Sequence, residues 1–176
     1  MKKFLLTTLI CICGLQLKAQ DVIEFMGVPL CGSDTTEYCS VLREKGFVLF
    51  GDSGKSKMYK GLFSGMEASV MVVPFEGSSK ATAIVLTLYD LNPVKGGTVY
   101  GEFLQKFLQK YQNMKYESHT DLKGSTTTTF SNDSGFVALK MDVADMGRSC
   151  QISVYYTYNG KNAVTKDGDG LSMDDI

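Results

Sequence analysis

A short amphipathic helix followed by four short strands occurs twice in this chain, at about residues 32–90 and again at about residues 97–158. In the last strand of each copy, Ile84 and Ile152 occupy the same place, at an offset of 68 residues. A unit of this size buries one face of its helix against one face of its strands and leaves the other sheet face uncovered. We therefore expect the two units to join into one sheet.

Two helices are expected, one in each copy. The first begins near Asp34, which has Glu37 three residues on at the spacing of a capping box, and it ends at Gly46. The second is expected at about residues 98–114, after an interruption at residues 92–97 that is rich in glycine and contains a proline. Its apolar stripe consists of Tyr100, Phe103, Leu104, Phe107, Leu108 and Tyr111.

The alternation of the last strands predicts which sheet face meets the helices. The matched apolar positions are Ile84, Leu86 and Leu88 in the first copy and Ile152, Val154 and Tyr156 in the second. The same offset matches Leu139 and Met141 to Met71 and Val73. The predicted fold is α+β: two tandem α-β-β-β-β units form one antiparallel sheet of about eight strands, with both helices on one face.

The two ends of the chain differ in composition from the part between them. Residues 1–19 have a positive start and then an apolar stretch, as in a secretory signal peptide, with cleavage expected after Ala19. An uncleaved or lipid-anchored form is the alternative. Residues 20–160 are expected to form a single domain, and residues 161–176 a flexible acidic tail. The expected location is periplasmic or secreted, with no membrane insertion after signal cleavage.

Three cysteines remain after the expected cleavage: Cys31, Cys39 and Cys150. In an oxidising compartment, an odd number suggests one disulfide and one remaining thiol. Cys31 and Cys39 flank the start of the first helix, so we expect a disulfide between them. Cys150 begins an alternating strand and is expected to be a small core or edge residue.

The chain offers few residues for catalysis or for binding of a metal or cofactor. Its single histidine, His119, lies in a polar segment, and no serine stands in a nucleophile-elbow context. The formal net charge of −1, with both signs interspersed, argues against a nucleic-acid partner. We expect no enzymatic activity, no metal site and no cofactor.

The uncovered sheet face is the predicted binding surface. The residues expected to bind a partner there are Tyr59, Val85, Tyr89, Phe136 and Tyr155, and Ala138 is expected on the same face. A mixture of tyrosine with small and apolar residues suits contact with another protein. Ordinary exposure of tyrosine, or cover by an end of the chain, is an equal alternative for these residues.

The tandem helix-plus-four-strand plan resembles the β-lactamase inhibitor protein architecture. Residues 25–29, 46–47 and 59–65 also look like segments of small exported proteins of Bacteroides-type bacteria. The resemblance implies a binding scaffold with an open sheet face and no catalytic centre. The predicted function is that of a non-catalytic exported protein that binds a protein partner in the cell envelope through this face or its loops. A carbohydrate- or small-ligand-binding module is the alternative, and the oligomeric state is left open.

Overall fold

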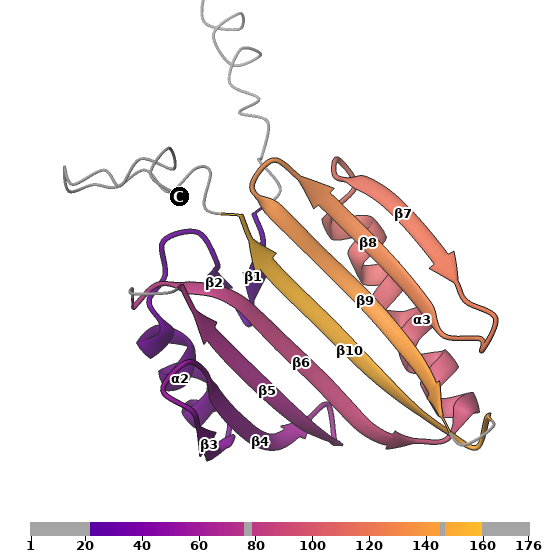
Figure 1. Ribbon diagram of the computed structural model, residues 1–176, viewed down its shortest axis with the longest axis horizontal. Coiled ribbons are helices and arrows are strands. Elements are labelled where there is room, and N and C mark those ends of the chain that lie inside the picture. The colour runs from indigo at the N-terminus through magenta and orange to yellow at the C-terminus, as the bar shows by residue number, and fades with distance from the viewer. Residues whose placement is uncertain (1–21, 76–78, 145–146, 160–176) are drawn as a thin grey trace, which may run out of the picture.

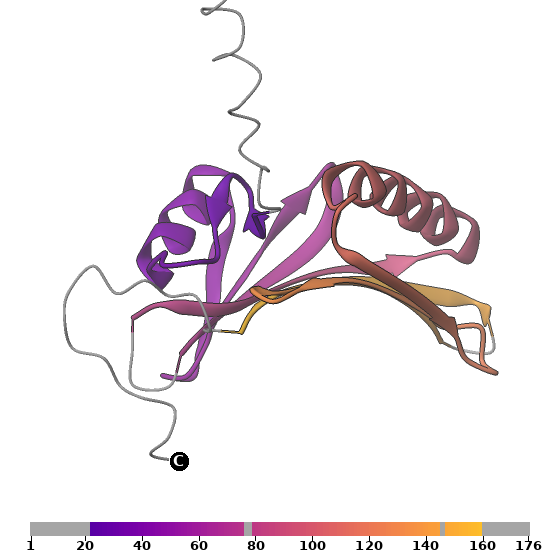
Figure 2. The same cartoon turned by 90° about the horizontal axis from the view of Figure 1, so that it is seen from above.

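The computed structural model of the protein describes residues 22–75, 79–144 and 147–159. It has one large antiparallel sheet of eight strands with both helices on the same face, which confirms the predicted fold class (Figure 2). The predicted signal peptide at residues 1–19 and the predicted tail at residues 161–176 lie outside the described residues. Neither described helix is long and apolar enough to span a membrane.

The two predicted units follow one another along the chain (Figure 1). The first consists of helix α2 (Thr35–Glu44) and strands β3 (Val48–Asp52), β4 (Lys57–Phe63), β5 (Met66–Pro74) and β6 (Ala81–Leu91). The second consists of helix α3 (Pro93–Lys110) and strands β7 (Lys115–Thr120), β8 (Thr126–Asn132), β9 (Gly135–Ala144) and β10 (Ser149–Tyr158). A small hairpin of β1 (Glu24–Phe25) and β2 (Val28–Pro29) precedes them.

The two units meet at the centre of the sheet, where the last strand of each pairs with the last strand of the other. The strand order is β3-β4-β5-β6-β10-β9-β8-β7. Leu86 of β6 lies opposite Val154 of β10, and these two residues are 68 positions apart, the same offset that relates Ile84 to Ile152. Leu86 and Val154 are thus equivalent residues that lie directly opposite one another, so a local two-fold axis passes between them.

One predicted match between the units is wrong. Val70 lies opposite Leu86, and Leu139 lies opposite Val154, so Leu139 corresponds to Val70 and not to Met71. Because successive side chains of a strand point to opposite faces, this shift of one residue moves Met71 and Val73 to the face away from the helices. Val70 is buried in the core.

Helix α3 begins earlier than predicted. Asn92 is its N-cap, and the Asn92 side chain accepts a hydrogen bond from the backbone N–H of Lys95 at 2.8 Å. Pro93 follows at the first helical position, which suits a residue without an N–H. The glycines that were expected to interrupt the chain therefore lie within the first turns of the helix. One of them, Gly96, is buried against the side chain of Cys150.

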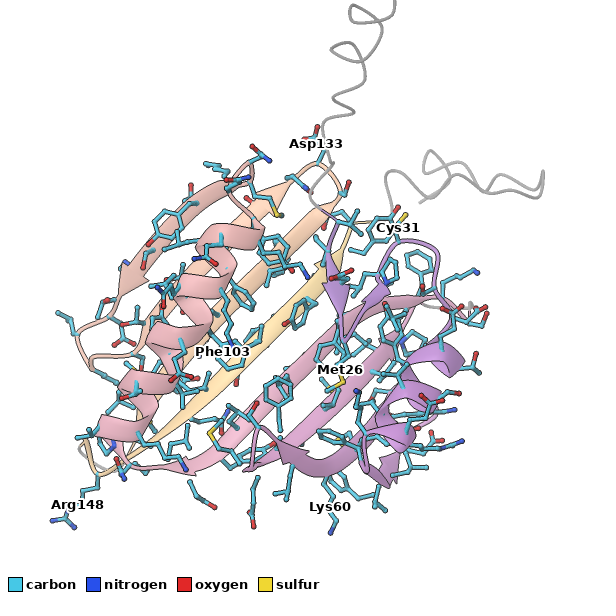
Figure 3. The ribbon with its side chains drawn as sticks, turned by 180° about the vertical axis from the view of Figure 1, so that it is seen from behind. Met26, Cys31, Lys60, Phe103, Asp133 and Arg148 are labelled. Carbon is cyan, nitrogen blue, oxygen red and sulfur yellow. The ribbon has the colours of Figure 1, made fainter. Side chains whose placement is uncertain are left out.

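The core lies between the helices and the sheet. All six matched positions predicted for this face are buried. The hairpin β1–β2 contributes to the same layer: Phe25 packs on Tyr156, with ring centroids 5.4 Å apart. Figure 3 shows Met26, at the tip of the hairpin, and Phe103, on α3, both in the region between the two helices.

The hairpin contacts both helices. The ammonium of Lys110, at the end of α3, lies 2.7 Å from a carboxylate oxygen of Glu24. The hydroxyl of Tyr38, on α2, donates a hydrogen bond of 2.7 Å to the carbonyl oxygen of Pro29. The segment that precedes the two units thus connects them on the helical side.

Candidate functional site

The sheet face opposite the helices is turned toward the viewer in Figure 1, and no described element covers it. Directly opposed residues of antiparallel strands lie on the same face, so the register of the sheet defines rows that cross it. One row is apolar on five successive strands. It consists of Met58, Met71, Val85, Tyr155 and Ala138, on β4, β5, β6, β10 and β9, and we call it the apolar strip.

A second row on the same face is polar. It consists of Lys60, Ser69, Thr87, Ser153 and Lys140, on the same five strands, and we call it the polar row. Its middle is covered by neighbouring side chains: Ser153 is buried, and its hydroxyl accepts a hydrogen bond from the Gln151 amide at 3.2 Å. At one end, the hydrogen bond to the Asp142 carboxylate, 2.8 Å away, raises the pKa of Lys140.

Three of the predicted binding residues lie together on this face. Val85 and Tyr155 are directly opposite one another within the apolar strip. Phe136 is on β9, two residues before Ala138, which places it diagonally across from Tyr155. All three are partly exposed, so their side chains are available to a partner.

The other two predicted binding residues are placed differently. Tyr59 lies opposite Val70 and faces the helices, where its side chain is 0% exposed, so its assignment to the open face is wrong. Burial and the nearby Cys39 thiol raise the pKa of Tyr59 to about 12. Tyr89 is exposed, but the polar row separates it from the apolar strip, and its hydroxyl is 2.5 Å from that of Ser69.

Sequence reasoning missed two members of the apolar strip, namely Met58 and Met71, whereas Ala138 lies on the open face as predicted. Met71 was assigned to the helix-facing side because of the incorrect register of β5. Met58 lies directly opposite Met71, so it lies on the same open face. A correct pairing of Val70 with Leu86 would have identified both residues.

The predicted disulfide is not present. No disulfide bond occurs among the cysteines of the described residues, so the predicted Cys31–Cys39 pair is wrong. Cys39 is buried on α2, where it packs in the core, whereas Cys31 is exposed and its thiol is 3.4 Å from the hydroxyl of Tyr158. Cys150 is buried as expected for a core residue, and its burial raises the pKa of its thiol.

His119 is exposed on the edge strand β7, opposite Thr127. Within the described residues, no three His, Cys, Asp or Glu side chains are grouped to hold a metal ion. The buried polar contacts are hydroxyl pairs: Tyr100 is 2.6 Å from Thr128, which is 2.9 Å from Ser118. This series of hydroxyl contacts provides hydrogen-bond partners for the polar side chains where α3 packs on β8.

Comparisons with protein-family models, with curated proteins and with solved structures gave no match to this chain.

Proposed function

We propose that the protein is a non-catalytic exported binding protein that presents its open sheet face to a protein partner in the cell envelope. The observation that carries the proposal is the apolar strip. It crosses five strands on a face that no described element covers. Five neighbouring strands span about 19 Å at the usual spacing, a width suited to a protein surface.

The composition of the strip supports protein recognition. Met58 and Met71 are unbranched and polarisable, so they adapt to the shape of an apolar partner. Tyr155 adds a large aromatic surface with a polar end, a residue type enriched in interfaces. The two ends of the polar row, Lys60 and Lys140, provide polar groups beside the strip of the kind found at the rim of an interface.

Two further parts of the proposal rest on the sequence alone. The positive and apolar start at residues 1–19 supports export, and export places the partner in the envelope or outside the cell. The tandem plan, similar to that of the β-lactamase inhibitor protein, supports a binding scaffold.

The alternative, a carbohydrate- or small-ligand-binding module, is less well supported. Such a module would gather its tyrosines around one pocket. Of the three tyrosines predicted for this face, Tyr59 lies in the core, and Tyr89 is separated from Tyr155 by the polar row. The arrangement therefore favours a protein surface.

The test is partner capture from an envelope extract, followed by measurement of affinity with the purified partner. In the test variant, Met71→Ala and Tyr155→Ala are combined. Removal of two central interface side chains is expected to weaken binding by roughly thirtyfold or more, the equivalent of about 2 kcal/mol. Tyr89→Ala, on the same face, and Leu108→Ala, an exposed residue of α3, are the controls and should bind as the wild type does. Equal affinity of the test variant and both controls would refute the proposal.

A further inference from the structure

The edge strand β3 exposes an unusual amount of apolar surface. Its residues Val48, Leu49 and Phe50 are 62%, 40% and 51% exposed, and Leu62 of the neighbouring strand β4 is 64% exposed. Val48 lies opposite Lys60, so Leu62 is its diagonal neighbour on the open face. Together these four side chains form an apolar edge at one end of the sheet.

The opposite edge of the sheet has a different character. Leu49 lies opposite Tyr59, and in the second unit Ser118 lies opposite Thr128, so Leu49 and Ser118 occupy equivalent places. By the same pairing, Val48 corresponds to Glu117, which forms an ion pair with Lys115 at 2.6 Å. Charged side chains on an edge strand oppose pairing with another chain. The β7 edge is protected in this way, whereas the equivalent positions of β3 are apolar.

The segment around β3 has a charge pattern that matches a second, antiparallel copy of itself. The segment from Lys45 to Asp52 reads Lys-Gly-Phe-Val-Leu-Phe-Gly-Asp, with opposite charges at its ends, a glycine inside each charge and apolar residues in the middle. Lys45 and Asp52 are both exposed. Antiparallel pairing brings each Lys45 toward the Asp52 of the other copy, whereas parallel pairing brings like charges together.

We propose that two copies of this chain pair antiparallel through their β3 edges to form a two-fold symmetric dimer. The fold already contains one contact of this kind, because β6 and β10 pair about the local two-fold axis between the units. A two-fold contact buries the same patch on both copies and closes after two subunits. This dimer is independent of the proposed partner-binding face.

The register of the proposed contact follows from the two faces of the sheet. The two copies keep their open faces on the same side when Val48 of one copy lies opposite Val48 of the other, on the two-fold axis. In that register, Phe47 of each copy lies opposite Leu49 of the other. Phe50 is the extra residue of a bulge between Leu49 and Gly51. Lys45 lies in the turn between α2 and β3, just before the strand begins, so antiparallel pairing places it at the same end of the contact as Asp52 of the other copy.

The first experiment is sedimentation analysis of the purified protein from about 1 μM to about 1 mM, with and without Val48→Lys. The wild type is expected to dimerise, and the variant, which places two lysines together on the axis, should raise the dimer dissociation constant at least about tenfold. Leu122→Lys is the control, since Leu122 is fully exposed in a turn away from β3, and it should not change the dissociation constant. A monomer throughout the range, or an equal effect of both variants, would overturn the proposal.

The second experiment tests the geometry without introducing a charge. Val48→Cys in a Cys31→Ser background should form a disulfide-linked dimer on mild oxidation, because the two new thiols face each other across the axis. Glu117→Cys, at the equivalent position of β7 and in the same Cys31→Ser background, is the matched control. It should run as a monomer in non-reducing electrophoresis. Cross-linking through Glu117→Cys alone, or through neither variant, would contradict a β3 dimer.

Discussion

Gly96 is the glycine whose substitution tests the packing of α3 against the sheet most directly. A Cβ placed on Gly96 would lie 1.9 Å from the Sγ of Cys150, far inside the usual contact distance of about 3.5–4.0 Å. Overpacking of this kind costs about 1–3 kcal/mol, while replacement of a helical glycine by alanine stabilises by about 1 kcal/mol. We expect Gly96→Ala to lower the free energy of unfolding by up to about 2 kcal/mol.

Two other glycines of the same helix serve as controls. Gly97 and Gly101 have no atom within 4 Å of a built Cβ, so alanine at either position should raise the free energy of unfolding by up to about 1 kcal/mol. The assay is urea unfolding of each variant, with an unchanged slope as evidence that only stability has altered. A Gly96→Ala protein that is as stable as Gly97→Ala would refute the packing argument.

A double-mutant cycle identifies the atom responsible. The next atom beyond Sγ is the Cβ of Cys150, at 3.5 Å, an ordinary contact. Cys150→Ala removes Sγ, so Gly96→Ala should become neutral or stabilising in that background. The expected coupling is about 1–3 kcal/mol in favour of the double variant. Additive effects would assign the cost to some other part of α3.

Two further predictions concern buried side chains. Tyr100→Phe should lower the free energy of unfolding by about 0.5–1.5 kcal/mol, because it removes the hydrogen bond with Thr128 while Thr128 keeps its contact with Ser118. Tyr59→Phe should leave the free energy of unfolding unchanged or raise it, since the Tyr59 hydroxyl has no hydrogen-bond partner among the described residues; thermal and urea unfolding compare the two variants. In native protein a thiol reagent should modify Cys31 rapidly and the buried Cys39 and Cys150 only after unfolding, as read by mass spectrometry. Equal labelling of all three thiols in the folded state would contradict their placement.

The sequence predicted the core of the last strands because only one of their faces is strongly apolar at matched positions. Strand β5 lacked this asymmetry. Residues 70–73 are all apolar, so alternation does not distinguish a helix-facing residue from one on the open face. The error in its register also concealed Met58 and Met71, which is why only part of the apolar strip was predicted.

Two other errors come from tertiary contacts that a local pattern does not contain. Residues 92–97 look like a break because they combine proline with two glycines, yet Gly96 is required for close contact with Cys150. The predicted disulfide relied on the short spacing of Cys31 and Cys39. In the structure one thiol points into the core and the other lies at the surface near Tyr158.

The last described strand lies at the middle of the sheet, and this placement constrains the order of folding. Strand β10 lies between β6 and β9. A chain that stops before Ser149 therefore leaves β6 and β9 each with one unpaired edge. Phe25, near the start of the described chain, packs on Tyr156 of β10, so its contacts are complete only when β10 is in place. Contacts between such distant residues slow folding. The sheet therefore closes only when residues 149–158 have been synthesised, and the chain remains incompletely folded until then.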